Sequence, residues 1–315
     1  MERKVKKKPI IIMVISIIIV LIIGISIALY IKDQNYKKTY DYKLGKLGYS
    51  KEEIITIKKL DEDSINIILS HEYDAFIIDL IQRKYFLKKN LDKYLDYIKE
   101  NDSNDFDKVI AIINVGANKE WYTDTTLTDT SKNELLLTNK FYKLNEDYEP
   151  DDLIDISNVY AYGENQKLRK DAYDAFINMF NGAKKEDITL IVNSSYRSYQ
   201  DQEETYNNYS SWYGSDEADK IAARPGFSEH QTGLSLDIQS YKTNRNNFEE
   251  SDAFKWLQDN AYKYGFILRY PKDLEYLTGY NYESWHYRYV GIEAATYIHE
   301  NNITYDEYYA YFIEK

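Results

Sequence analysis

Residues 228–238 read SEHQTGLSLDI, and residues 282–291 read YESWHYRYVG. The chain of 315 residues contains only four histidines, and each of these stretches holds one of them close to a carboxylate. Apolar and polar side chains alternate along 233–240, which is the pattern of a β-strand with one buried face. The alternation predicts that Asp237 points away from that buried face.

Two pairs of residues in these stretches predict a metal site. Six residues separate His230 from Asp237, and a turn at Gly233 would let the two side chains converge. Together with His286 they offer two imidazoles and a carboxylate, the donor set of a catalytic zinc that keeps its fourth position for water. Glu283, three residues before His286, would stay unligated and exchange a proton with that water.

Composition limits the possible classes of function. The chain has no cysteine, which excludes disulfides, thiolate metal ligands and a cysteine nucleophile. A hydrophobic fraction of 43% and an aromatic fraction of 16% are sufficient to fill a core. Proteins bind nucleic acid largely through basic groups that neutralise phosphates and release their counterions. The chain has a net charge of −12, so no nucleic-acid partner is expected.

Residues 10–31 form an apolar run without a charge, which predicts a transmembrane helix. Such a helix would span roughly 33 Å, enough for the hydrocarbon core of a bilayer. Residues 1–9 carry a basic cluster, so the positive-inside rule places the N-terminus in the cytoplasm and the rest of the chain outside. A cleaved signal peptide is the alternative, but its apolar region is typically about 7–15 residues long.

The remainder of the chain divides into three predicted segments. Residues 32–49 are rich in tyrosine and lysine and are expected to form a linker. Residues 50–107 carry apolar positions at steps of three and four, which predicts a small helical module. Residues 108–315 are expected to form the domain that carries the metal site.

The fold class follows from the mixture of elements in that domain. VIAIINVG at 109–116 is predicted as a strand because of its β-branched residues, and so is ITLIVNS at 188–194. The period of 166–181 predicts a helix that stops at Gly182. Helices and strands that do not alternate regularly indicate an α+β fold, with an antiparallel sheet and flanking helices.

Four stretches of this domain resemble the VanY-type zinc D-alanyl-D-alanine carboxypeptidases of bacteria. They are SSYRSYQDQ (194–202), PGFSEHQTGLSLDI (225–238), YGFILRYP (264–271) and TGYNYESWHYRYVG (278–291). The resemblance covers about residues 135–312. It implies removal of C-terminal D-alanine from peptidoglycan stem peptides, by a domain that faces the cell wall from the bacterial cell membrane.

The resemblance also implies a role for individual residues. It implies that one Zn²⁺ is held by His230, Asp237 and His286. Glu283 corresponds to the general base, and Arg197 to the arginine that meets the substrate carboxylate or the developing oxyanion. Three further positions are implied to bind substrate, namely Gln202, Ser228 and Trp285.

Several alternatives stay open on the sequence alone. Two histidines and a carboxylate also form the facial triad of non-haem iron oxygenases, although that role leaves Glu283 idle and needs reduced iron outside the membrane. The same fold would serve a non-catalytic module that binds or senses the cell wall. Spacing does not distinguish a D,D-carboxypeptidase from an L,D-carboxypeptidase that acts on tetrapeptide stems.

Overall fold

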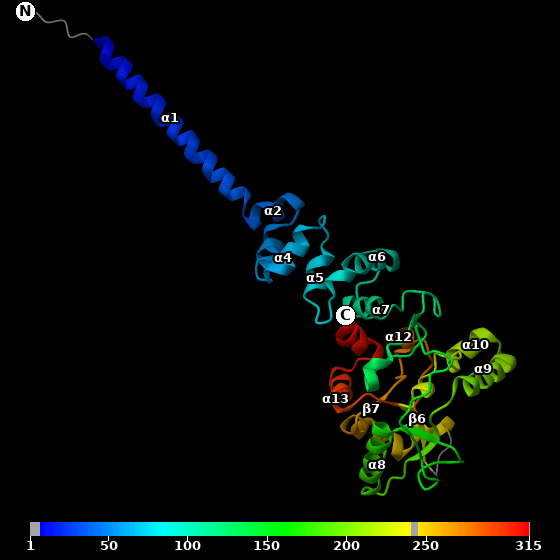
Figure 1. Cartoon of the computed structure of the whole chain (residues 1–315). Coiled ribbons are helices and arrows are strands. Elements are labelled where there is room, and N and C mark those ends of the chain that lie inside the picture. Colours follow the sequence, from blue (N-terminus) through cyan, green and yellow to red (C-terminus); the bar gives the residue numbers. More distant parts are fainter. Residues whose placement is uncertain (1–6, 241–244, 315) are drawn as a thin grey trace, which may run out of the picture. The chain divides into compact units, whose positions relative to one another are not determined.

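The computed structural model describes residues 7–240 and 245–314, and the chain divides into two compact units, Met1–Lys99 and Glu100–Lys315. Most of the N-terminal cluster of basic residues at 1–9 therefore lies outside the described residues. Along the chain, helices dominate the first unit, and the second unit combines helices with strands (Figure 1).

The first unit begins with the long helix α1 (Lys7–Lys37). Among the described residues, α1 is the one helix that is long and apolar enough to cross a membrane. The helices that follow it are α2 (Tyr40–Leu47), α3 (Lys51–Ile57), α4 (Glu62–Leu69), α5 (Phe76–Ile81), η1 (Lys88–Asn90) and α6 (Leu91–Asn101). Ser50 and Glu53 form a reciprocal capping box that fixes the start of α3.

The segment 32–49, expected as a linker, is largely helical. Helix α1 continues to Lys37, and Thr39 caps α2 by accepting a hydrogen bond from the backbone N–H of Tyr42. Leu44 of α2 is fully buried. Its burial explains why this segment folds, although few of its residues are aliphatic.

The second unit contains a sheet of four antiparallel strands in the order β5-β6-β8-β7. Their bounds are β5 (Ile191–Ser194), β6 (Ser235–Gln239), β7 (Phe266–Leu268) and β8 (His286–Tyr289). Two small pairs lie outside this sheet, β1 (Thr126–Leu127) with β2 (Tyr142–Lys143), and β3 (Leu153–Asp155) with β4 (Lys167–Arg169). The α+β class and the antiparallel sheet are confirmed.

Helices surround the sheet in the second unit (Figure 1). They are α7 (Phe106–Val115), η2 (Thr130–Leu135), α8 (Lys170–Lys184), α9 (Tyr199–Tyr213), α10 (Ser215–Ile221), η3 (Glu229–Thr232), η4 (Arg245–Glu250), α11 (Asp252–Asn260), η5 (Ala261–Tyr264), α12 (Glu275–Thr278), α13 (Ile292–Asn301), α14 (Tyr305–Tyr308) and η6 (Tyr309–Ile313). The main core joins α8 and α11 to one face of the sheet, where Phe176 and Phe254 contact the same cluster as Leu236.

Three predictions about local structure were wrong. VIAIINVG, predicted as a strand, lies in helix α7. Asp105 caps this helix, and Gly116 ends it in a left-handed conformation. Helix α8 begins at Lys170 and passes through Gly182 to Lys184. Strand β6 does turn Asp237 away from the apolar core, as predicted, but both of its faces are buried and not one: Leu236 is 0% exposed on the core side and Asp237 only 4% on the other, where a polar cluster covers it.

Candidate metal centre and active-site pocket

The register of the sheet places two of the three expected ligands opposite each other. Asp237 of β6 pairs with His286 of β8 across the antiparallel ladder. Directly opposed residues in a sheet project from the same face, with side chains about 5 Å apart at Cβ. Pairing therefore brings the carboxylate and the imidazole together although 49 positions separate them in the chain.

The third expected ligand reaches the same place from the short helix η3. Ser228 caps this helix, and Gly233 ends it in a left-handed conformation (φ 67°) that turns the chain into β6. His230 Nδ1 lies 2.7 Å from the backbone carbonyl of Ser195, so this nitrogen carries the proton and donates it. Nε2 of His230 is left to face Asp237.

The donor atoms of His230, Asp237 and His286 all lie within 4.8 Å of one another. Asp237 Oδ1 is 3.1 Å from His286 Nδ1 and 3.6 Å from His230 Nε2. A tetrahedral zinc with ligand distances of about 2.0–2.2 Å requires separations of this size between its donors. The three residues therefore fit a zinc ion in chemistry and in spacing.

In the absence of metal, the pKa values of the two histidines are shifted in opposite directions, although burial lowers both. Burial and the nearby Arg197 lower the pKa of His230 to about 3, so its imidazole is neutral and ready to coordinate. Burial also opposes protonation of His286, but hydrogen bonds to Asp237 and Glu229 raise its pKa to about 9. Binding of a metal at Nδ1 of His286 would therefore release a proton.

Glu283 and Arg197 both lie at the pocket that contains this cluster. Glu283 Oε2 is 3.8 Å from His286 Nδ1, and its side chain is 14% exposed. Arg197 is held by two hydrogen bonds that it donates, to Gln202 Oε1 at 2.8 Å and to Ser194 Oγ at 3.0 Å. A carboxylate and a fixed guanidinium thus flank the expected metal position.

The three expected substrate-binding residues occupy different environments. Gln202 and Ser228 line the pocket, and Gln202 is 1% exposed. The Gln202 amide donates to the carbonyl of Ala223 while its oxygen accepts from Arg197, so it holds the guanidinium in place. Trp285 is not among the residues that line this pocket, and its ring packs against the hydrophobic core instead.

Comparison with known proteins identifies the family to which the chain belongs. The family model described as VanY, D-alanyl-D-alanine carboxypeptidase, matches residues 165–292. The chain is 32% identical over 188 residues to the bifunctional D-Ala-D-Ala dipeptidase and carboxypeptidase VanXYC of Enterococcus gallinarum, and the match covers 57% of this chain and 95% of that protein. The chain belongs to the VanY family.

Two further proteins are similar to this chain. YodJ of Bacillus subtilis is 48% identical over 187 residues, which is 56% of this chain and 67% of YodJ. The solved structure of the LdcB LD-carboxypeptidase is 43% identical with a TM-score of 0.56, and it covers 60% of this chain and 91% of that one. All of these matches leave a large part of the present chain uncovered.

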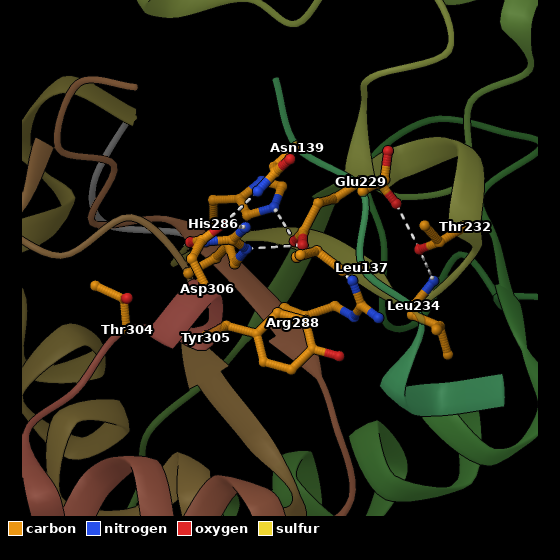
Figure 2. A network of polar contacts seen from close by, with 12 residues as sticks. Leu137, Asn139, Glu229, Thr232, Leu234, His286, Arg288, Thr304, Tyr305 and Asp306 are labelled. Carbon is orange, nitrogen blue, oxygen red and sulfur yellow. Dashed lines mark hydrogen bonds and ion pairs between the residues drawn. The ribbon is translucent and has the colours of Figure 1, made fainter. Parts of the chain in front are cut away.

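Sequence reasoning missed a buried polar network behind the candidate metal centre (Figure 2). Glu229, next to His230 in sequence, lies 3.4 Å from Nε2 of His286. Its other carboxylate oxygen accepts hydrogen bonds from Arg269 Nε at 2.7 Å and Arg288 Nη1 at 2.9 Å. Although burial raises the pKa of Glu229, the two guanidinium groups lower it well below its usual range.

The network extends away from the metal centre through Arg269. Arg269 donates two hydrogen bonds to Asp306, which also accepts one from the amide of Asn139 at 2.7 Å. Arg288 donates to the backbone carbonyl of Leu136 at 2.6 Å. One signal for Arg288 was present in the sequence, because alternation along a strand places it on the same face as His286 two residues earlier.

Proposed function

We propose that this protein is a zinc-dependent carboxypeptidase that removes the C-terminal D-alanine from peptidoglycan stem peptides. The observation that carries the proposal is the convergence of His230, Asp237 and His286 beside Glu283 in one pocket. Membership of the VanY family supports the reaction class.

The side chains of the pocket divide the chemistry among them. His230, Asp237 and His286 would hold one Zn²⁺, which when bound polarises a carbonyl group and makes a water molecule more acidic. Glu283 takes a proton from the attacking water and delivers it to the departing amine. Arg197, fixed by Gln202, pairs with the terminal carboxylate or with negative charge that develops on the scissile carbonyl.

A second candidate is an L,D-carboxypeptidase that cleaves the bond before the terminal D-alanine of tetrapeptide stems. The observation that favours it is the similarity to LdcB, whose structure is described as an LD-carboxypeptidase. The two activities share the metal centre and the proton transfer. They differ in whether the residue that contributes the carbonyl group of the cleaved bond has the D or the L configuration.

The experiment uses the full chain in detergent with pentapeptide and tetrapeptide stems, and mass spectrometry of the products. We expect loss of one alanine from the pentapeptide, abolition of this reaction by a chelator, and its recovery when zinc is added. Cleavage of the tetrapeptide alone would establish the second candidate. Binding of both peptides without release of alanine by zinc-loaded protein would instead indicate a sensor of the cell wall.

The location of the protein is a further part of the proposal. Helix α1 is suited to anchor the chain in the bacterial cell membrane. The basic residues before it favour a cytoplasmic N-terminus, which would leave the VanY domain outside the cell facing its substrate.

A further inference from the structure

Three aromatic rings form an exposed cluster at the C-terminal end of α9. They belong to Tyr209, Trp212 and Tyr213, and their ring centroids lie 5.8 to 6.4 Å apart. Trp212 is 67% exposed and Tyr213 58% exposed. Large aromatic side chains that gather in solvent are typical of surfaces that bind a partner.

The cluster is continuous with the active-site pocket along one side of α9. Gln202, Thr205 and Tyr209 of this helix line the pocket. Residues three and four apart lie on the same side of a helix, so the same side continues from Tyr209 to Trp212 and Tyr213. Tyr209 therefore belongs both to the wall of the pocket and to the exposed cluster.

The length of this helix side matches the size of the proposed substrate. Trp212 lies ten positions after Gln202 along α9, which corresponds to a rise of about 15 Å. In a pentapeptide stem, roughly four residues separate the scissile bond from the sugar, and these span about 13 Å when extended. A sugar that carries the peptide would thus reach the height of the cluster while the scissile bond lies in the pocket.

We infer that the cluster of Tyr209, Trp212 and Tyr213 binds the sugar rings of the glycan strand that carries the stem peptide. The inference rests on the proposed function, because it takes the peptide to be the substrate. One face of a pyranose ring presents C–H groups that pack flat on an indole or phenol ring. Rigid aromatic side chains provide such contacts at a low cost in conformational entropy.

The charge around the cluster favours a neutral sugar over a membrane surface. Helices α9 and α10 carry six carboxylates and a single lysine between Tyr199 and Ile221. Glu203, Glu204 and Asp216 among them are exposed. Such a surface is repelled by anionic lipids, although exposed tryptophan and tyrosine alone would also suit a bilayer interface.

The test compares wild-type full chain in detergent with the double variant Trp212→Ala/Tyr213→Ala. One measurement is the Kd for oligomers of N-acetylglucosamine, a neutral sugar of the glycan strand, and the other is KM for a free pentapeptide and for the same pentapeptide on its disaccharide. We expect Kd to rise about tenfold or more, which is the loss of one or two stacking contacts. The advantage in KM of the disaccharide substrate disappears, while kcat and KM for the free pentapeptide stay within about twofold.

Two further variants control this test. Phe312→Ala removes a 40% exposed ring from another aromatic cluster, that of Tyr297 and Tyr308, and should leave glycan binding unchanged. Trp212→Phe keeps an aromatic surface and should retain most of the affinity. An equal rise in KM for both peptide substrates, or an unchanged Kd for the N-acetylglucosamine oligomers, would overturn the inference.

The membrane alternative and the proposed function are tested separately. In liposomes that contain brominated lipids, wild type and Trp212→Phe should show the same number of quenched tryptophans. Quenching of Trp212 itself would place the cluster in the bilayer and overturn the inference. Retained glycan binding without hydrolysis of either peptide would instead count against the proposed carboxypeptidase while leaving the sugar site in place.

Discussion

His286 lies between two sets of carboxylates, and each set contacts a different ring nitrogen. Asp237 and Glu283 lie on the Nδ1 side, at 3.1 and 3.8 Å, and Glu229 lies on the Nε2 side, at 3.4 Å. Only Nδ1 faces the other two donors, so this nitrogen is the expected metal ligand. The Nε2–H group is then free to donate to Glu229, which fixes the tautomer and the ring orientation.

The role of Glu283 predicts a specific defect in Glu283→Gln. The amide keeps the size of the side chain but does not accept a proton, so kcat should fall by about 10²- to 10⁴-fold. Zinc content should stay at the wild-type value, since Glu283 is not one of the three converging donors. Steady-state kinetics and elemental analysis of the same samples check both points, and near-normal turnover would disprove the proton transfer.

Glu229→Gln is expected to weaken zinc binding without removing a ligand. Loss of the charged partner of His286 typically costs about 10- to 100-fold in metal affinity, measured here by competition with a chromophoric chelator. Asp306→Asn is the matched control, because it weakens the contact with Arg269 but leaves Glu229 beside His286. Equal loss of zinc affinity in both variants would show a general loosening of the fold in place of an effect on the ligand.

At the level of elements, the sequence predicted the parts of the site that depend on short-range signals. Gly233 makes the turn between His230 and Asp237, and β6 lies within the stretch 233–240 where the alternation placed a strand. The pairing of Asp237 with His286 was not readable from spacing, because it depends on the strand register. The resemblance to the VanY family implied the set of ligands, and the structure supplied the pairing.

The errors arose where tertiary packing decides the structure. Helix α7 packs against α12 and α14, and a helix buried on most sides carries the same continuous apolar run as a buried strand. Gly182 lies inside α8 and does not end it. A glycine is needed at this position for space, because an added Cβ would collide with the hydroxyl group of Tyr264. Neither neighbour is visible in the local sequence.

Gly233 connects His230 to the strand of Asp237, and Gly233→Ala should disturb both stability and metal binding. Its φ is 67°, and an added Cβ would lie 2.9 Å from Arg169 and from Leu153. We expect a loss of about 1–3 kcal/mol in the free energy of unfolding and a lower zinc affinity.

Gly163→Ala provides the control for that substitution. Gly163 also has a positive φ, of 76°, but nothing lies within 4 Å of its added Cβ. This variant should lose only the cost of the left-handed conformation, about 1 kcal/mol, and should bind zinc normally. Chemical denaturation and chelator competition distinguish the two variants, and identical effects would mean that the turn at Gly233 does not position His230.

At the scale of the whole molecule, the family match and the apolar helix fall in different units. The VanY match lies entirely within the second unit, Glu100–Lys315, and the helix suited to a membrane lies in the first. An enzyme of the cell wall must be exported, and an anchor would keep it close to newly made peptidoglycan. The activity we propose therefore depends on orientation as much as on the metal centre.

The orientation can be tested because the chain has no cysteine. Asn208→Cys introduces a thiol on the exposed side of α9, and Lys4→Cys introduces one before the apolar run. The cells are intact but their wall has been removed, and the maleimide used does not cross membranes. It should label the Asn208→Cys variant directly, and the Lys4→Cys variant only after permeabilisation. Labelling at 4 in intact cells would reverse the topology, and since peptidoglycan stem peptides face the outside, it would separate the enzyme from the substrate we propose.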